Sequence, residues 1–540
     1  MDLGAAEREL VDWLAAQLDR SSADVLESVL TPPEAPGLVA TTVVAGRFTR
    51  LSLRAIGQRL RWENPIASDL TVPLTGLDAL TELDVSEMEL DALDLSSQPT
   101  LVRLEASGNR LKQLELDGNP ALETLNVAAN DLMVLDLREN PRTWFCDCTG
   151  NALTALVLAE PNVLKVLRCA RNQLMVLDPG PTPELTELDC GRNALVRLVL
   201  DAPRLRTLRC QRNQLTELDV GALPELTRLK VSRNRLASLP LQTCARLEEL
   251  DCARNYLDHL ALVELVRLER VDVSFNQLES LSLGRCAALV HLDCGNNHLR
   301  TLAIADCPSL EVLVCEGNGL DALPLADAPS LCDLRADHNR FHTLSLGQNP
   351  RLARVQLREN PLERLELDQN HVLAYLELDD GVVVVATPTL RQRLKALRRA
   401  DGRPTGGALA RMDRWQAHAM AATYDEPDRE RVFLPLVRDT ARCARGTAVM
   451  LYWMASPHYY LQFDDRSEVP AYAQAGWDLI TAVEEHVRNG DYAHDDLFFD
   501  PRDDQQTTEV RGRDWTRDES GASRVSKRTI PAFMTRACGV

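Results

Sequence analysis

Cysteine is the residue type in this sequence best suited to chemistry, because a thiolate can serve as a nucleophile, a redox centre or a metal ligand. The chain has 14 cysteines among 540 residues. Half of them stand three residues before an asparagine: Cys148, Cys169, Cys190, Cys210, Cys252, Cys294 and Cys315. Elsewhere the same position holds Val85, Ala106 or Val127, so it accepts any small apolar side chain. We therefore interpret these cysteines as buried structural thiols without metal or redox chemistry.

Other catalytic patterns are weak. The sequence has no Gly-rich phosphate loop, no paired Cys or His metal spacing and no Gly-x-Ser-x-Gly turn. The strongest remaining cluster is His458 beside Tyr459 and Tyr460, which we interpret as part of an aromatic core. We predict a protein that is not an enzyme and that uses no cofactor and no metal.

Basic side chains form a second set with chemical potential. Five stand directly before asparagines, and we call them the rim arginine column: Arg171, Arg192, Arg212, Arg233 and Arg254. Three more stand four residues before an asparagine, and we call them the inner basic column: Arg168, Arg209 and Lys230. Because a guanidinium group binds a carboxylate through two hydrogen bonds, we hypothesise that both columns bind an acidic segment of a partner protein. The alternative is that these side chains pair with neighbouring Asp and Glu and keep the surface soluble.

A repeat positions these residues. Its marker is an asparagine that recurs every 21 residues, with one step of 20 residues from Asn193 to Asn213. The full series is Asn109, Asn130, Asn151, Asn172, Asn193, Asn213, Asn234, Asn255, Asn276, Asn297, Asn318, Asn339 and Asn360. A period in this range predicts a solenoid. The shorter step removes a residue between Leu200 and Leu205, where we expect it to leave the strand register intact.

One unit shows the pattern in full. It places Leu185, Leu188, Cys190, Asn193 and Leu195 at the spacing L-x-x-L-x-C-x-x-N-x-L. This resembles the leucine-rich repeat of bacterial proteins, here of the 21-residue type with Cys and Asn columns, over about fifteen units. The resemblance implies a parallel β-sheet on the concave face and extended or 3₁₀ segments on the convex side.

Elementary geometry supports that reading. Leu188 and Cys190 alternate with Glu187 and Asp189, as in a strand with one face buried. The asparagine amide can satisfy backbone groups where the chain leaves the strand. One unit is too small to bury its own leucines, so the units must stack.

The chain divides into five predicted segments. We expect an N-terminal cap with amphipathic helices in 1–79, the solenoid in 80–385, and a basic capping helix and linker in 386–407. A C-terminal domain follows in 408–502, where the pattern becomes helical and where 13 of the 24 aromatic residues lie. The polar tail 503–540 is expected to be disordered.

The C-terminal domain resembles a small bacterial family known as domain of unknown function 4274. The resemblance rests on the stretches Cys443–Ala448, Leu451–Trp453 and Trp477–Ile480, continuing through Tyr492 to Pro501. No activity comes with that family, so it implies a domain boundary and no mechanism.

Net charge limits the partners. The formal charge of -20 disfavours nucleic acid and anionic membranes, no apolar run is long enough to span a bilayer, and Met1–Arg20 does not read as a signal peptide. We expect a bacterial, cytoplasmic monomer that binds a protein on the concave face of the solenoid. The alternative is a protein exported without a cleavable signal, a host-directed or toxin-system effector or immunity protein acting through its C-terminal domain.

Overall fold

The computed structural model describes residues 3–54 and 72–387, and further on residues 421, 429–455 and 465–492. Gaps within these ranges fall at 19, 31–40, 46, 368, 371–372, 374, 380, 442, 444, 471–472 and 490. Two compact units, Met1–Leu278 and Glu279–Val540, are described in turn. The predictions made for the basic helix after 386, for His458 and for the tail 503–540 lie outside the described residues.

The N-terminal region is helical and then extended. Helices α1 (Ala5–Leu18) and α2 (Ser22–Leu30) precede strands β1 (Thr42–Val44) and β2 (Arg47–Ser52). The two strands pair antiparallel, and β2 also pairs in parallel with β3 (Glu82–Asp84). The N-terminal region therefore supplies a strand on which the repeat sheet begins.

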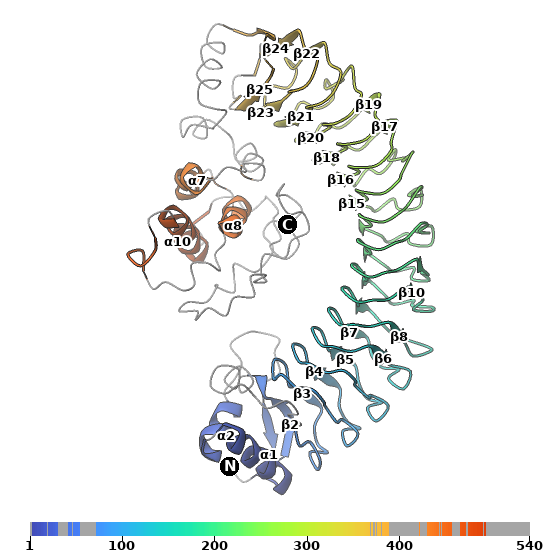
Figure 1. Ribbon diagram of the computed structural model, residues 1–540, viewed down its shortest axis with the longest axis vertical. Coiled ribbons are helices and arrows are strands. Elements are labelled where there is room, and N and C mark those ends of the chain that lie inside the picture. Colours follow the sequence, from blue (N-terminus) through green and yellow to red (C-terminus); the bar gives the residue numbers. More distant parts are fainter. Residues whose placement is uncertain are drawn as a thin grey trace. The chain divides into compact units, whose positions relative to one another are not determined.

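The first unit contains a parallel sheet with one strand from each repeat (Figure 1). After β3 its strands are β4 (Arg103–Glu105), β5 (Thr124–Asn126), β7 (Phe145–Asp147), β9 (Val166–Arg168), β11 (Glu187–Asp189), β13 (Thr207–Arg209), β14 (Arg228–Lys230), β15 (Glu249–Asp251) and β16 (Arg270–Asp272). Each pairs with the next in register. Leu188 pairs with Leu208 across the short step, so the missing residue is absorbed outside the sheet, as predicted.

Short extended segments follow the asparagine turn. They are β6 (Val134–Asp136), β8 (Ala155–Val157), β10 (Val176–Leu177) and β12 (Arg197–Leu198). Strand β6 pairs with β8 and β10 pairs with β12, both in parallel. Extended structure on the far side of the repeat is thus confirmed.

The asparagine series joins consecutive repeats. Asn213 accepts a hydrogen bond from the Leu195 N–H at 2.9 Å and donates to the carbonyls of Cys190 and Cys210 at 3.0 Å each. Asn130 and Asn234 make the same contacts in their own repeats. Each amide therefore satisfies buried backbone groups of two repeats, as the sequence predicts.

A second set of buried amides was not anticipated. Ten residues after the main asparagine, Asn119 donates to the carbonyls of Leu95 and Gln98, at 3.1 Å and 2.8 Å. Asn140 repeats the arrangement with Leu116 and Asn119. In other repeats the same position holds Cys244, Cys286 or Cys307, all buried.

The second unit continues the repeat pattern. Its strands are β17 (Ser280–Leu283), β18 (His291–Asp293), β19 (Thr301–Ile304), β20 (Val312–Val314), β21 (Asp333–Arg335), β22 (Thr343–Ser345), β23 (Arg354–Gln356), β24 (Arg364–Glu366), β25 (Tyr375–Glu377) and β26 (Val383–Val385). They form parallel pairs like those of the first unit. The leucine-rich-repeat solenoid inferred from the asparagine period is therefore confirmed in both units.

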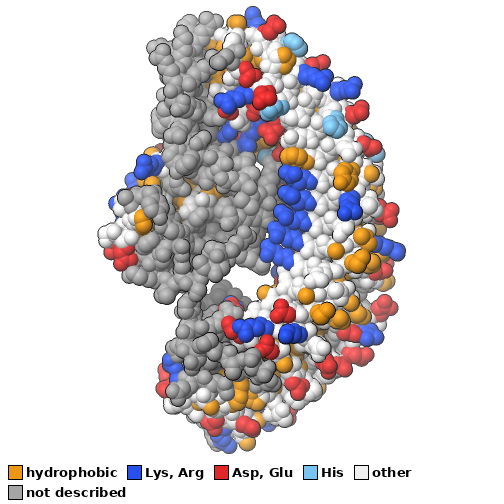
Figure 2. Space-filling model, in the orientation of Figure 1, with side chains coloured by type: hydrophobic (Ala, Val, Ile, Leu, Met, Phe, Trp, Pro, Cys, Tyr) orange, Lys and Arg blue, Asp and Glu red, His pale blue; other side chains and the backbone are white. Residues whose placement is uncertain are grey.

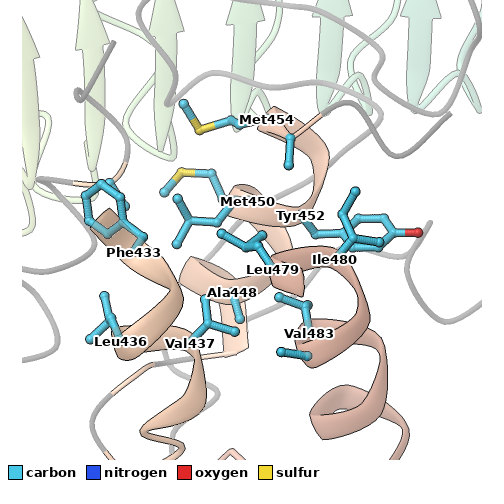
Figure 3. Packing of buried hydrophobic residues seen from close by; sticks show 14 of the residues in the cluster. Phe433, Leu436, Val437, Ala448, Met450, Tyr452, Met454, Leu479, Ile480 and Val483 are labelled. Atoms are coloured by element: carbon cyan, nitrogen blue, oxygen red, sulfur yellow. The ribbon is translucent and has the colours of Figure 1, made fainter. Parts of the chain in front are cut away.

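The C-terminal domain is mainly helical, as predicted. Its described helices are α7 (Arg429–Arg438), α8 (Arg445–Met454) and α10 (Gln474–Asn489). Figure 3 shows their apolar faces meeting around Phe433, Tyr452 and Ile480, which are buried. The Tyr452 hydroxyl donates to the buried Glu484 carboxylate at 3.0 Å. Among the described helices, none is long and apolar enough to cross a membrane.

Candidate protein-binding surface

The cysteines face the core. All 13 that lie in the described residues are buried and none forms a disulfide. Burial is the main factor that raises the pKa of the Cys169, Cys190 and Cys252 thiols well above the ordinary value. In the described part of the chain, no group of three or more His, Cys, Asp or Glu side chains is placed to hold a metal ion. The interpretation as buried thiols agrees with this geometry.

The rim arginine column occupies an unusual backbone position. Arg171, Arg192, Arg212, Arg233 and Arg254 all have φ between 55° and 57°. Other repeats place Gly108 or Gly150 there, at a φ of 70°, or a residue with a Cβ atom such as Ala129, His338 or Glu359, at a φ of 53° to 55°. A residue with a Cβ atom is disfavoured in this left-handed region, and glycine is not. The left-handed conformation therefore belongs to the repeat position, and five consecutive repeats place arginine in it.

All five rim arginines are exposed. Among the described residues, no carboxylate lies within ion-pairing distance of Arg192, Arg212 or Arg233. Partial burial, followed by the positive charges of the other four, lowers the pKa of Arg212, so the charges are close enough to repel. Figure 2 shows a continuous column of Lys and Arg side chains over the repeats.

An aromatic ring ends the column. Phe275 holds the next equivalent position, also in the left-handed region at a φ of 54°. The Arg254 guanidinium carbon lies 3.8 Å from the centre of its ring. A cation over an aromatic face is attracted by the ring electrons. Because Phe275 is itself 41% exposed, the last arginine stacks on an apolar surface that a partner can also reach.

The inner basic column behaves differently. Arg168 and Arg209 both contact Glu187, at 3.0 Å and 3.4 Å. Lys230 lies 3.3 Å from Glu249 and is buried. Lys230 is the least accessible of the three, because a glutamate on the neighbouring strand draws the ammonium group onto the sheet. The soluble-surface alternative describes these three residues better than it describes the rim.

Acidic residues four before the asparagine have a structural role that the sequence analysis missed. Asp147, Asp189 and Asp251 each accept a hydrogen bond from the backbone N–H two residues later, at 3.0 Å, 3.1 Å and 3.2 Å. The signal was available, since Asp two residues before a small residue favours this local turn. Burial and the nearby charge of Asp272 raise the pKa of Asp251 to about 7.

The family known as domain of unknown function 4274 matches residues 415–487, which confirms that resemblance. Among curated proteins, none matches this chain.

Similar solved structures are leucine-rich-repeat proteins. The functional domain of InlJ from Listeria monocytogenes, described as including a cysteine ladder, is 25% identical with a TM-score of 0.42, over 53% of this chain and 65% of that one. A leucine-rich-repeat protein of Leptospira interrogans is 22% identical with a TM-score of 0.47, over 61% and 87%. YopM from Yersinia enterocolitica is 28% identical with a TM-score of 0.43, over 57% and 69%. The assignment of the fold rests on the repeat geometry of this chain.

Proposed function

We propose that this chain is a protein-binding module and that the rim arginine column takes up an acidic segment of a partner protein. The observation that supports this best is the unpaired state of Arg192, Arg212 and Arg233 among the described residues. These three belong to a run of five successive repeats that place arginine in the same left-handed position. The neighbouring inner column meets its carboxylates within the chain. Arg192, Arg212 and Arg233 are thus the charges that carboxylates of a partner can pair with.

The energetic balance favours a functional origin for the column. Left-handed backbone disfavours a residue with a Cβ atom by roughly 1–2 kcal/mol relative to glycine. Like charges at adjacent repeats add repulsion, as the lowered pKa of Arg212 indicates. The repulsion between neighbouring arginines opposes folding and is specific to the column, whereas the left-handed backbone is shared by repeats without arginine, such as those of Ala129 and Glu359. A bound acidic segment would remove the repulsion and form charge-assisted hydrogen bonds.

Capture of a partner protein by the full chain and by two triple variants tests the proposal. The column variant carries Arg192→Ser, Arg212→Ser and Arg233→Ser together. A control variant loses the same charge at three exposed arginines outside the column: Arg138→Ser, Arg204→Ser and Arg246→Ser. We expect the control variant to capture the same partner protein as the wild-type chain, and the column variant to capture none. Cross-linking of the wild-type chain should join the rim arginine column to an acidic stretch of that partner. Undiminished capture by a folded column variant would remove this site from consideration.

A further inference from the structure

The first unit also exposes apolar side chains just beyond the asparagine turn. They stand three and four residues after the asparagine, and we call them the side strip: Met133, Val134, Met175, Val176 and Val196. They are 60%, 50%, 62%, 53% and 45% exposed. They belong to three of four consecutive repeats, since the second of the four places Thr154 and Ala155 there. Single exposed apolar residues are ordinary, but a set gathered in this way marks an interaction surface. Methionine suits such a surface because its flexible thioether adapts to its contacts.

The side strip begins close to the rim arginine column. Met175 stands four residues after Arg171, and a chain of that length spans at most about 14 Å. The left-handed backbone at Arg171 turns the chain between them. Figure 2 shows apolar side chains on the same face as the basic column, across a band of uncharged residues. One partner segment of ordinary width can therefore contact both.

Uncharged residues lie between the strip and the column in three repeats. They are Ala152, Gln173 and Ala194, and the second repeat of the strip contributes Thr154 and Ala155. Exposed charges stand at the two ends of the strip, at Asp131 beside Met133 and at Arg197 beside Val196. Apolar contact in the middle of the strip therefore removes few charged groups from water.

Spacing selects the form of the partner. Adjacent strands lie roughly 4.8 Å apart, so the rim arginines recur at about that interval. A helix rises about 5.4 Å per turn and presents one carboxylate per turn on one face. An extended chain presents same-side residues only every ~6.8 Å. A helix along the column thus meets nearly every arginine, and its adjacent face is turned toward the strip at the two repeats that carry both, those of Arg171 with Met175 and of Arg192 with Val196.

We propose that the partner segment is an amphipathic acidic helix whose carboxylate stripe binds the rim arginine column and whose apolar stripe binds the side strip. This inference rests on the proposed function and narrows it to one class of segment. A helix with both stripes buries its apolar face while it neutralises the arginines.

Two synthetic peptides test the inference with the full chain. Both carry Glu at one position per helical turn, and the adjacent stripe is Leu in one peptide and Ser in the other. The strip variant carries Met175→Ser, Val176→Ser and Val196→Ser, and its control carries Val263→Ser and Val266→Ser, which are 49% and 50% exposed. Circular dichroism checks that each variant folds, and fluorescence anisotropy gives the affinities.

We expect the Leu peptide to bind the wild-type chain at least about tenfold more tightly than the Ser peptide. The strip variant should bind both peptides equally, and the control should behave as wild type. Equal affinities for the two peptides in the wild-type chain would overturn the inference while leaving Arg-dependent binding of the Ser peptide, and hence the proposed function, in place. Binding of the Leu peptide that survives loss of Arg192, Arg212 and Arg233 would overturn both.

Discussion

At the scale of single residues, the asparagine side chain is the main link between repeats. Asn213 makes three hydrogen bonds to backbone groups of two repeats. Replacing it by alanine leaves those buried groups unsatisfied, so we expect Asn213→Ala to destabilise the solenoid by about 1–3 kcal/mol. Chemical denaturation measures this, with exposed Thr216→Ala as the control. A midpoint unchanged within error would contradict the role given to the amide.

The cysteines should be chemically silent in the folded chain. Cys190 is fully buried and its thiol pKa is raised, chiefly by burial. Only the thiolate reacts, so native thiol titration at pH 8 should be slow and should become fast on unfolding. Cys190→Val should fold normally, because Val231 holds the equivalent position. Rapid native modification of the seven equivalent cysteines would refute this.

Asp251 should make stability depend on pH. Its pKa rises from 3.8 to about 7 through burial and the charge of Asp272, against the opposing effects of Ser232, the Ala253 N–H and Lys230. The folded chain therefore holds this proton more tightly than the unfolded chain does. Its contribution to stability is largest below 3.8 and is lost as the pH rises towards 7.

Asp251→Asn removes that titration and keeps the turn, since Asn126 fills the equivalent position and accepts the Ala128 N–H. We expect the variant to gain stability over wild type as the pH rises from 5 to 8. Denaturation midpoints at both pH values provide the measurement. A difference between variant and wild type that does not change with pH would show that Asp251 does not titrate in this range.

Residue types alone predicted part of the candidate site. The rim arginines were found because they share one position, directly before the repeat asparagine, and the structure leaves them exposed. The burial of Lys230 could not be predicted in this way, because it depends on Glu249, a residue one repeat further on. The left-handed backbone was also hidden, since arginine gives no hint of a conformation that favours glycine.

At the scale of elements, the repeat is the unit that sequence reasoning handles best. Every repeat needs leucines for the shared core and an asparagine for the turn, so these residues recur at a fixed period. The period therefore predicts where the strands lie and how they pair. The convex amides of Asn119 and Asn140 escaped notice because they occupy only some repeats. Their role depends on which carbonyls the stacking of neighbouring repeats leaves without partners.

Removing one whole repeat should therefore be tolerated. Deleting residues 214–234 takes out 21 residues and joins Asn213 to Arg235, which holds the position after an asparagine. We expect a folded chain with four rim arginines and a moderately weaker affinity for an acidic peptide. Circular dichroism and size-exclusion chromatography report the fold. As the control, deletion of residues 214–223 removes only part of a repeat, which breaks the leucine pattern and should unfold this region. If both deletion variants fold equally well, or neither folds, the repeat is not an independent structural unit.

At the scale of the whole molecule, the rim arginine column is a basic feature on a chain of formal charge -20. Charges separated by more than about 8 Å are largely screened at physiological ionic strength. The acidic surface elsewhere on the chain therefore does little to repel a bound acidic segment. The direct contacts between that segment and the rim arginines are shorter than this distance and are screened less. The same screening weakens exposed ion pairs as salt increases, so salt dependence reports directly on the binding mode.

The most direct measurement is the affinity of a labelled oligo-glutamate peptide for the full chain, followed by fluorescence anisotropy at increasing sodium chloride. The central claim predicts that affinity falls as salt rises. It also predicts that binding is lost when Arg192, Arg212 and Arg233 are replaced by Ser, and that it is retained when Arg138, Arg204 and Arg246 are replaced instead. Affinity that is independent of salt, or equal in the two triple variants, would contradict the claim that the rim arginine column binds acidic partners.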